Sequence, residues 1–494
     1  LSNTGSVTTT ATSSLNVSDQ AIGIYKKGGS INLGGTVNVA SHTAPGLNTE
    51  PAAVYATGGV NVNDTTSNFN IGDKSYGVIL NNRGTAANTY VNSAGSNVIL
   101  GNESTFIYSD GNASIVNNAN INGLTNDGIT AIYVKNGGEV TNNGRIDLSQ
   151  GKGNLGILVT GTGSRAINNT SGVINVGRTN VDDPNNIIYG IGIAATNGGY
   201  SENRGNITVM GNNSIGMYGD GRGTVMKNSG NIYLNADSAS SSNKIQTMIG
   251  VFADNATISD LRTGPTTLGT SSIGYAMNGG SFTNVSGTQF VGNDSVYVYA
   301  RNGSNVVNNR AITMTGGQGV ALYGKDGTNI VNDADINQGS GIENVGILIT
   351  GSGSAENKAG RTITVSKSYL ADENAPETGK YSIGMAGEST NGGALSLVNN
   401  GKIVVNSHRS IGMYGSGRGT TVENRGDIIL DASNATASDK IEQMTGMYLN
   451  NGATGVNYGN IKTAGNYAGN PNVKGIMGVV ALNGSTFENR GNIE

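Results

Sequence analysis

The stretch Ile215–Tyr218 reads IGMY and is followed shortly by Asn228–Ile232, which reads NSGNI. The same two runs return as Ile411–Tyr414 (IGMY) and Asn424–Ile428 (NRGDI), and looser copies recur about every two dozen residues. A period in this range is typical of stacked supersecondary units, because one unit is too small to bury its own apolar face. The second position of the IGMY run falls at seventeen residues: Gly23, Ala53, Gly77, Phe106, Ile132, Gly156, Gly192, Gly216, Gly250, Gly274, Tyr297, Ala321, Gly346, Gly384, Gly412, Gly446 and Gly478.

Within each copy, apolar residues alternate with small or polar ones, as at Ile215 and Met217 and again at Ile232 and Leu234. A period of two is the pattern of strands with one buried face. The segments between them, such as Gly219–Gly223, are rich in residues that form tight turns. The sequence therefore predicts an all-β chain. It would be a right-handed parallel β-helix of about seventeen coils, with short strands, Gly/Asn turns and protruding loops, running as one body through residues 1–494.

The composition narrows the classes of function. The chain of 494 residues has a formal net charge of -4, and its Lys and Arg residues are scattered singly, so we expect no nucleic-acid partner. It has no cysteine, which excludes disulfides, thiolate metal sites and thiol nucleophiles. We predict neither a cofactor nor a metal site. The last residues, Asn489–Glu494, stop partway through a copy of the repeat, so we expect a fragment of a longer secreted or surface protein.

Two residue types recur at fixed places in the repeat. The asparagines before the closing strand are expected to stack as a ladder inside one turn: Asn169, Asn228, Asn309, Asn357, Asn424 and Asn489. Aromatic residues two positions beyond the anchor are expected to form a solvent-facing stripe: Tyr25, Tyr55, Tyr108, Tyr218, Phe252, Tyr299, Tyr323, Tyr414 and Tyr448. Stacking of the rings along the coils is the interpretation that we favour. Exposed tyrosines are also common at sugar and protein interfaces, and that alternative stays open.

A slower repetition of about 190 to 200 residues is superimposed on the short one, and it divides the chain into super-repeats at 1–190, 191–383 and 384–494. The spacing between coils swells at places that recur with this long period. The swellings are Ala40–Pro51, Ala236–Ile245 and Ala432–Ile441, then Gly177–Ile188 and Ser366–Tyr381, then Ser259–Ser271 and Thr463–Lys474. The extra residues must leave the coil as loops, and in solenoids such loops often form the binding face.

Charged residues in one pair of loops are the predicted binding residues. They are Arg178, Asp182 and Asp183 in one loop, and Lys367, Asp372, Glu373 and Lys380 in its counterpart. An equally weighted alternative is that these loops are inert surface excursions whose sequences drifted.

Catalytic motifs are weak. The run Gly151–Gly156 has the letters of a dinucleotide-binding turn, but a predicted strand follows it where a helix is needed. Arg425–Asp427 reads RGD, yet it fills an ordinary position of the repeat. No Gly-x-Ser-x-Gly elbow occurs, and neither His42 nor His408 lies in a triad context. We therefore predict no catalytic residue, and a polysaccharide-processing enzyme remains the alternative from another class.

The paired IGMY and N-x-G-x-I runs resemble the passenger region of the large fusobacterial autotransporter adhesins, the RadD-like outer-membrane proteins. The resemblance covers essentially the whole chain. It implies a β-helical passenger that a C-terminal β-barrel, absent from this fragment, exports to the surface of a Gram-negative cell and links to the membrane. It also implies coaggregation with other bacteria and attachment to host cells, and it carries no binding motif onto particular residues.

These observations together predict a segment of a surface-displayed adhesin. A monomeric rod would present its loops to proteins or glycans on host or bacterial cells, and repeated weak contacts would add through multivalency. Two alternatives are the enzyme described above and an inert spacer whose binding tip lies elsewhere in the full-length protein.

Overall fold

The computed structural model describes residues 5–44, 49–82, 84, 86–234, 248–368, 381–437, 440–465 and 467–494. Within these ranges the regular structure consists of strands. No helix in them is long and apolar enough to cross a membrane. The chain forms two units, unit 1 (Leu1–Ser259) and unit 2 (Asp260–Glu494).

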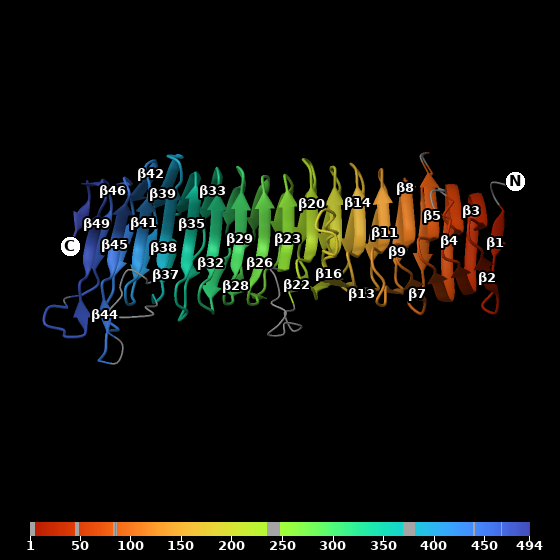
Figure 1. Cartoon of the computed structure of the whole chain (residues 1–494), viewed down its shortest axis with the longest axis horizontal. Helices are drawn as coiled ribbons and strands as arrows, with labels where there is room; N and C mark the ends of the chain where they lie inside the picture. The colour runs from red at the N-terminus through yellow and green to blue at the C-terminus, as the bar shows by residue number, and fades with distance from the viewer. Residues whose placement is uncertain are drawn as a thin grey trace. The chain divides into compact units, whose positions relative to one another are not determined.

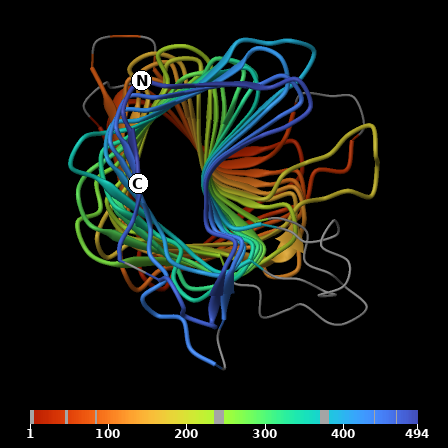
Figure 2. The ribbon, with the colours of Figure 1, turned by 90° about the vertical axis from the view of Figure 1, so that its left-hand side faces the viewer.

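Each unit is a stack of coils, and a coil contributes strands to three faces (Figure 1). Every strand pair described between coils is parallel, as in β11 (Thr130–Lys135) with β14 (Leu155–Thr160). Viewed along the coils, the strands within a unit lie one behind another (Figure 2). The predicted parallel β-helix is confirmed.

In unit 1 the first-face strands are β3 (Ile22–Val39) and β4 (Ala52–Ile71), which continue around the coil, then β5 (Tyr76–Asn82), β8 (Thr105–Gly111), β11, β14, β17 (Ile191–Thr196), β20 (Ile215–Asp220) and β23 (Met248–Asp254). The second face has β1 (Ser6–Thr8), β6 (Asn88–Asn92), β9 (Ala113–Asn117), β12 (Glu139–Asn142), β15 (Arg165–Asn168), β18 (Tyr200–Asn203) and β21 (Val225–Asn228). The third face has β2 (Ser14–Val17), β7 (Asn97–Leu100), β10 (Asn120–Asn122), β13 (Arg145–Lys152), β16 (Val173–Arg178), β19 (Asn206–Val209) and β22 (Asn231–Leu234). The boundary between the units falls within β24 (Thr257–Asp260).

In unit 2 the first face has β26 (Ser272–Asn278), β29 (Val296–Arg301), β32 (Val320–Lys325), β35 (Val345–Gly351), β38 (Ile383–Ser389), β41 (Ile411–Ser416), β45 (Thr445–Asn450) and β49 (Met477–Ala481). The second face has β27 (Ser281–Asn284), β30 (Asn305–Asn308), β33 (Thr328–Asn332), β36 (Gly353–Asn357), β39 (Leu395–Asn399), β42 (Thr420–Asn424), β46 (Thr454–Asn457) and β50 (Thr486–Asn489). The third face has β25 (Thr266–Leu268), β28 (Thr288–Val291), β31 (Ala311–Met314), β34 (Ile336–Asn337), β37 (Thr362–Val365), β40 (Lys402–Val405), β43 (Asp427–Leu430), β47 (Asn460–Thr463) and β51 (Asn492–Ile493).

The core is a set of columns of aliphatic side chains inside the coils. Ile107, Ile132, Ile157, Ile193 and Met217 stand in register on five successive first-face strands, and each is 0% exposed. Burying one such side chain contributes about 1.5–3 kcal/mol. A thin core is therefore sufficient to stabilise the stack, because every coil adds one buried side chain to each column.

One anchor position read from the sequence is wrong. Ile132 was expected at the second position of the IGMY run, but it stands in register with Ile107 and Ile157 and belongs to the inner column. Thr130 pairs with Thr105, so the next residue in each strand, Ala131 and Phe106, occupies the same position. Ala131 is therefore the anchor residue of its coil. The repeat period is unchanged, and the anchor of this coil moves from residue 132 to residue 131.

Glycine is required at the anchor where coils approach most closely. A Cβ atom built on Gly216 would lie 2.6 Å from the carbonyl oxygen of Gly250 in the next coil. The glycine of the N-x-G-x-I run is equally constrained, because a Cβ on Gly230 would meet the carbonyl oxygen of Gly205. Real side chains essentially never come so close, so the repeated glycines follow from the spacing between coils.

An asparagine ladder runs inside the turn at the end of the second face. In unit 1 the Nδ2 atom of Asn142 donates to Oδ1 of Asn168 at 2.9 Å, and Asn168 donates in the same way to Asn203 at 2.9 Å. The described ladder of unit 1 is Asn92, Asn117, Asn142, Asn168, Asn203 and Asn228. The ladder of unit 2 is Asn284, Asn308, Asn332, Asn357, Asn399, Asn424, Asn457 and Asn489.

The ladder was predicted, but two of its members were assigned one residue too late. Asn169 is half-buried and donates to Asn143 at 2.9 Å, and Asn309 donates to the backbone oxygen of Asn284 at 2.7 Å. Asn168 and Asn308 are the ladder residues, because they occupy the inward positions at the ends of β15 and β30. In a pair of adjacent asparagines, only the strand register decides which one points inward.

The extra residues leave the coil at one corner, between a third-face strand and the next first-face strand. The described residues of these outgrowths are 40–44, 49–51 and 179–190 in unit 1, and 366–368, 381–382, 431–437, 440–444, 464–465 and 467–476 in unit 2. We name each outgrowth by its first and last residue: 40–51, 179–190, 366–382, 431–444 and 464–476. Figure 2 shows the 179–190 outgrowth in yellow, outside the stacked coils. The swelling predicted at Ala236–Ile245 lies outside the described residues. All five outgrowths border the first face.

The swelling predicted at Ser259–Ser271 is not an outgrowth of this corner. It contains β25, whose Leu268 is buried and stands in register with Val291 on β28. The segment is therefore part of the third face, because Thr266 and Leu268 continue an ordinary strand column. Its predicted counterpart, Thr463–Lys474, does leave the coil, so the two are not a matched pair.

Candidate functional site

The aromatic residues predicted as an exposed stripe form a column on the outer side of the first face. Tyr218 stands in register with Phe252, Tyr299 with Tyr323, and Tyr414 with Tyr448. The ring centroids of these pairs are 5.8, 5.2 and 5.8 Å apart. All six rings are half-buried, because each ring is covered by its neighbour. Burial raises the pKa of Tyr218 and of Tyr448.

The column has one aromatic member that the sequence analysis missed, and it also contains non-aromatic residues, among them alanines. Tyr133 stands in register with Tyr108 and packs edge to face against it at 5.4 Å. It was missed because the anchor of its coil was assigned to Ile132. Ala194 and Ala386 occupy the same column in register with Tyr218 and Tyr414, respectively. Both alanines are 2% exposed.

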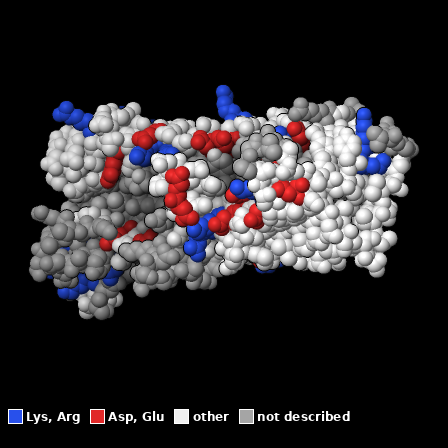
Figure 3. Space-filling model, turned by 45° about the vertical axis from the view of Figure 1, so that its right-hand side comes forward, with Lys and Arg blue, Asp and Glu red and all other residues white. Residues whose placement is uncertain are grey.

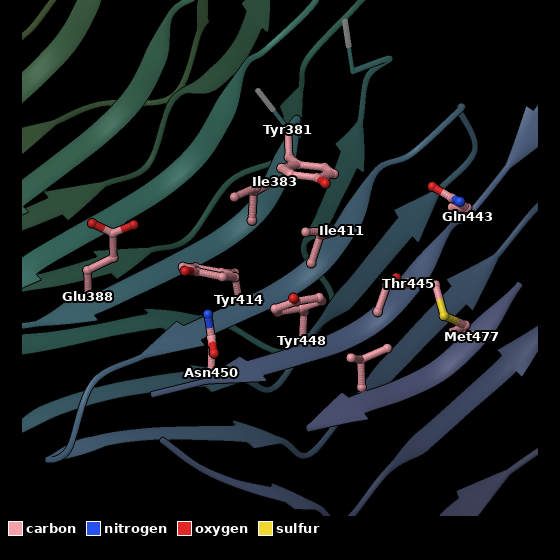
Figure 4. A pocket seen from close by; sticks show the side chains of 11 residues that line it. Tyr381, Ile383, Glu388, Ile411, Tyr414, Gln443, Thr445, Tyr448, Asn450 and Met477 are labelled. Carbon is pink, nitrogen blue, oxygen red and sulfur yellow. The ribbon is translucent and has the colours of Figure 1, made fainter. Parts of the chain in front are cut away.

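In unit 2 the outer side of the first face is hollowed into a groove beside Ala386, with a cavity volume of about 560 Å³ (Figure 4). This volume falls within the range of about 300–1,000 Å³ found for small-molecule sites. We call it the unit 2 groove. Its aromatic and aliphatic lining residues are Tyr381, Ile383, Ile411, Tyr414, Tyr448, Met477 and Val480, and its polar lining residues are Glu388, Gln443, Thr445 and Asn450.

The rings form one wall of the unit 2 groove. Tyr414 and Tyr448 are stacked at an interplanar angle of 29°. Tyr381, whose side chain is 40% exposed, stands on the other side of Ile383 and Ile411 (Figure 4). The neighbouring Tyr381 and Tyr414 rings raise the pKa of Tyr448 further, after burial itself. The Tyr448 hydroxyl therefore stays protonated near neutral pH and is able to donate a hydrogen bond.

Three outgrowths end at this groove. The lining residues Tyr381, Gln443 and Met477 follow or close the 366–382, 431–444 and 464–476 outgrowths. The last two outgrowths support each other, because β44 (Ile441–Glu442) pairs with β48 (Val473–Lys474) in a separate two-stranded sheet. The hydroxyl of Tyr467 also accepts a hydrogen bond of 3.0 Å from the backbone N–H of Ala432. The two outgrowths that carry Gln443 and Met477 are thus tied to each other by strand pairing and by a hydrogen bond.

The predicted charged residues of the loops do not line this groove. In unit 1, Arg178, Asp182 and Asp183 are exposed at the 179–190 outgrowth. Lys152 Nζ lies 2.8 Å from Asp182 Oδ2, and Asp183 accepts a hydrogen bond from the N–H of Asn185 at 2.9 Å. Asp182 and Asp183 therefore help to hold the outgrowth in shape.

In unit 2, Lys367 is exposed at the start of its outgrowth, next to β37. Asp372, Glu373 and Lys380 lie outside the described residues. The structure thus places four of the seven predicted loop residues, three in unit 1 and one in unit 2. None of these four contributes to the groove lining, which consists of side chains from β38, β41, β45, β49 and the rims.

The residues equivalent to the groove in unit 1 pack differently. Ile191, Ala194 and Ile215 form a buried apolar cluster against which Tyr218, Ile249 and Phe252 pack. Tyr189, at the end of the 179–190 outgrowth, is 45% exposed and corresponds to Tyr381. Ile249 stands where the unit 2 groove has Thr445, and Asp254 stands where it has Asn450.

The cluster richest in ionisable groups is buried and not open to a ligand. Arg262 donates to both oxygens of Asp260 at 2.8 Å and to the Tyr275 hydroxyl at 2.8 Å, and Asp260 is 0% exposed. Arg310, also 0% exposed, donates to the backbone oxygens of Arg262 and Gly264. The carboxylate of Asp260 and both guanidinium groups are thus engaged inside the protein, so we interpret the cluster as structural.

Surface charge does not mark a single binding patch. On the face shown in Figure 3, Lys and Arg side chains are interspersed with Asp and Glu side chains. Among the described residues, no group of three or more His, Asp or Glu side chains is arranged to hold a metal ion. The unit 2 groove is therefore the candidate site that the described geometry supports best.

Sequence reasoning found part of this site. Tyr414 and Tyr448 were named as members of the stripe, and Tyr381 as the end of a swelling. Gln443, Asn450 and Glu388 were missed, because each is an ordinary polar residue in its own coil. The spacing between copies of the repeat could have identified two of these residues as neighbours, because Glu388, Ser416 and Asn450 occupy the same position in three consecutive coils.

Comparison with known families gives one match. Residues 88–335 and residues 261–460 match the family described as the BigA third pectate lyase-like domain. The two spans together cover about three quarters of the chain. No curated protein matches it.

Proposed function

Since the chain belongs to the family of the BigA third pectate lyase-like domain, we propose that it is a segment of a surface-displayed adhesin. In this proposal the β-helix presents its outgrowths to another cell. It also presents the groove that these outgrowths border. The observation that carries the proposal is the meeting of three outgrowths at one concave, aromatic-lined surface on a rigid face. Binding residues are commonly placed on loops that a rigid scaffold positions.

The proposal extends to the setting of the full-length protein. The chain would be part of the passenger of a fusobacterial, RadD-like autotransporter, displayed on the outer face of the outer membrane. Its partners would be proteins or glycans on host cells and other bacteria. The repeated IGMY and N-x-G-x-I runs support this setting, and the β-helical fold is compatible with it.

We assign the chain binding and no catalysis. Support comes from the groove lining, in which Glu388 is the one carboxylate among the described residues, whereas hydrolysis of a glycosidic bond commonly uses two. The buried Asp260–Arg262 pair supports the same assignment, since a substrate has no access to it.

The test is an attachment assay with the purified chain. We expect residues 1–494 to bind bacterial or host cells in a saturable manner. Shortening the 464–476 outgrowth to the length of a plain coil should lower this binding. A matched variant with a shortened 40–51 outgrowth, in unit 1, should bind as the wild type does.

Circular dichroism and the unfolding midpoint of both variants should match those of the wild type, which would show that the coils are intact. A chain that attaches to no cell type would overturn the proposal and favour an inert spacer. Release of sugar products from a polysaccharide would favour an enzyme.

A further inference from the structure

We propose that the unit 2 groove binds carbohydrate, and specifically an uncharged pyranose unit of a glycan, with the sugar lying against the tyrosine rings. This inference rests on the proposed adhesive function and names the chemical class of ligand for the site. Three properties of the groove carry it: the fixed rings, the uncharged polar groups around them, and the absence of a cation in the described lining.

The rings offer a preformed apolar surface of the right kind. Tyr414 and Tyr448 are held side by side on adjacent strands, with centroids 5.8 Å apart, and each is half-buried. Tyrosine provides a large amphipathic contact area and loses little conformational entropy on binding. One face of a pyranose ring presents C–H groups, which suits an aromatic surface, while its hydroxyl groups project around the edge.

Uncharged hydrogen-bonding groups lie where those hydroxyls would be. Gln443, Thr445 and Asn450 contribute amide and hydroxyl groups to the lining. The Asn450 side-chain oxygen already accepts hydrogen bonds from the Asn451 N–H at 2.9 Å and from Asn483 at 2.7 Å. Its amide nitrogen is therefore left as a donor for a ligand oxygen. A few placed polar groups in a largely apolar cavity are typical of small-molecule sites.

Charge selects against an acidic ligand. The lining described for the groove includes the carboxylate of Glu388 and neither Lys nor Arg. A uronate or sialate bound there would approach a like charge without a cation to compensate it, and such juxtapositions are unfavourable. The site therefore suits a neutral hexose or an N-acetylhexosamine better than an acidic polysaccharide.

Unit 1 provides an internal control for the same fold position. There Phe252 replaces Tyr448, Ile249 replaces Thr445 and Asp254 replaces Asn450. These replacements remove two hydroxyl groups and add a second carboxylate close to Tyr218, where Asp254 and Asp220 raise the pKa of that tyrosine in addition to burial. In its described part the unit 1 surface keeps the ring column, but Ile249 and Asp254 stand in place of the uncharged polar residues Thr445 and Asn450, so we assign the sugar site to unit 2.

The experiment uses the whole chain and a defined set of probes. Neutral oligosaccharides of glucose, galactose, mannose and N-acetylglucosamine are immobilised beside oligogalacturonate and sialylated oligosaccharides. We expect neutral probes to retain the chain, and the best of them is then titrated calorimetrically. Tyr448→Ala and Tyr381→Ala should each weaken binding about tenfold or more, Tyr448→Phe should retain most of it, and Phe252→Ala should leave it unchanged.

The proposal is overturned if no neutral probe binds, if the acidic probes bind more tightly, or if Phe252→Ala weakens binding as much as Tyr448→Ala does. Attachment to cells separates this failure from failure of the adhesive function. If the chain attaches to cells equally well after periodate oxidation of their sugars, and Tyr448→Ala attaches like the wild type, the sugar site is wrong and a protein receptor is indicated.

Discussion

The side-chain amide of Asn168 donates a hydrogen bond of 2.9 Å to the side-chain oxygen of Asn203, although 35 residues separate the two in sequence. Asn168 also accepts the amide of Asn142, so each ladder residue joins the coil before it to the coil after it. Both ladder neighbours are 0% exposed. A gap in the ladder would leave two buried polar groups without a partner, which is costly.

We predict that Asn168→Ala lowers the free energy of unfolding by about 2–5 kcal/mol, because the amide of Asn142 loses its acceptor and Asn203 loses a donor. The adjacent Asn169→Ala should cost no more than about 1 kcal/mol, since Asn169 is half-buried and outside the ladder. Chemical denaturation of the two variants measures the difference. Equal destabilisation of both would show that the ladder is not placed as described.

Asp64 marks a place where the ladder departs from asparagine. It stands in register with Asn92 and is 0% exposed, and it accepts a hydrogen bond of 2.5 Å from the Tyr90 hydroxyl. Burial raises the pKa of this carboxyl group, and the hydrogen bonds from Tyr90 and Thr66 oppose the shift without cancelling it. The folded state therefore binds the proton more tightly than the unfolded state does.

It follows that the stability contributed by protonated Asp64 is fully present below the unfolded-state pKa and is lost as the pH rises through the folded-state pKa. We predict that Asp64→Asn raises the unfolding midpoint at pH 7 and that this gain shrinks as the pH is lowered toward 4. Thermal unfolding across that range tests the prediction. Asp183→Asn, at an exposed position, should leave the pH dependence as it is in the wild type, and a gain that is constant with pH would contradict the account.

The close approach of coils at the anchor makes a third prediction. Gly216→Ala should destabilise the chain by about 1–3 kcal/mol, since the added methyl group would lie 2.6 Å from the carbonyl oxygen of Gly250. Gly95→Ala is the matched control, because no heavy atom lies within 4 Å of a Cβ built there. Its effect should stay within about 0.5 kcal/mol. Denaturant midpoints of the two variants measure the contrast, and a neutral Gly216→Ala would disprove the packing argument.

The aromatic column should be measurable as coupling between coils. Tyr218 and Phe252 are stacked at an interplanar angle of 3°. A double-mutant cycle with alanine at both positions should give a coupling free energy of about 0.5–1.5 kcal/mol. The same cycle for Tyr108 and Phe252, which do not stand on adjacent strands, should give additive effects. Coupling as large in the second cycle as in the first would mean that the rings are not the cause.

Much of the fold was predictable because every coil buries its apolar side chains in the same way. The alternation at Ile215 and Met217 indicates a strand with one buried face, and recurrence of the pattern at coil length leaves a stack of parallel strands as the consistent arrangement. Apart from the swelling at Ser259–Ser271, the errors were local. Ile132 for Ala131, Asn169 for Asn168 and Asn309 for Asn308 are shifts of one residue. In strands, a shift of one residue exchanges the inner and outer faces.

The candidate site was less predictable. Tyr381, Gln443 and Met477 come from three different coils. The sequence does not show how closely the outgrowths that carry them approach one another. Asp182 and Asp183 were predicted as binding residues because they are charged residues in a loop. In the structure their side chains interact with Lys152 and Asn185 and help to hold their own outgrowth.

The sequence by itself determined the parallel β-helix, its period and most of the places at which extra residues interrupt the coils, because apolar alternation and turn residues repeat locally and each coil obeys the same short-range constraints. Tertiary structure alone decided which asparagine of each adjacent pair enters the ladder, and where three outgrowths meet over one groove. Those outcomes depend on register between coils, since strand pairing brings together side chains that lie dozens of residues apart in the chain.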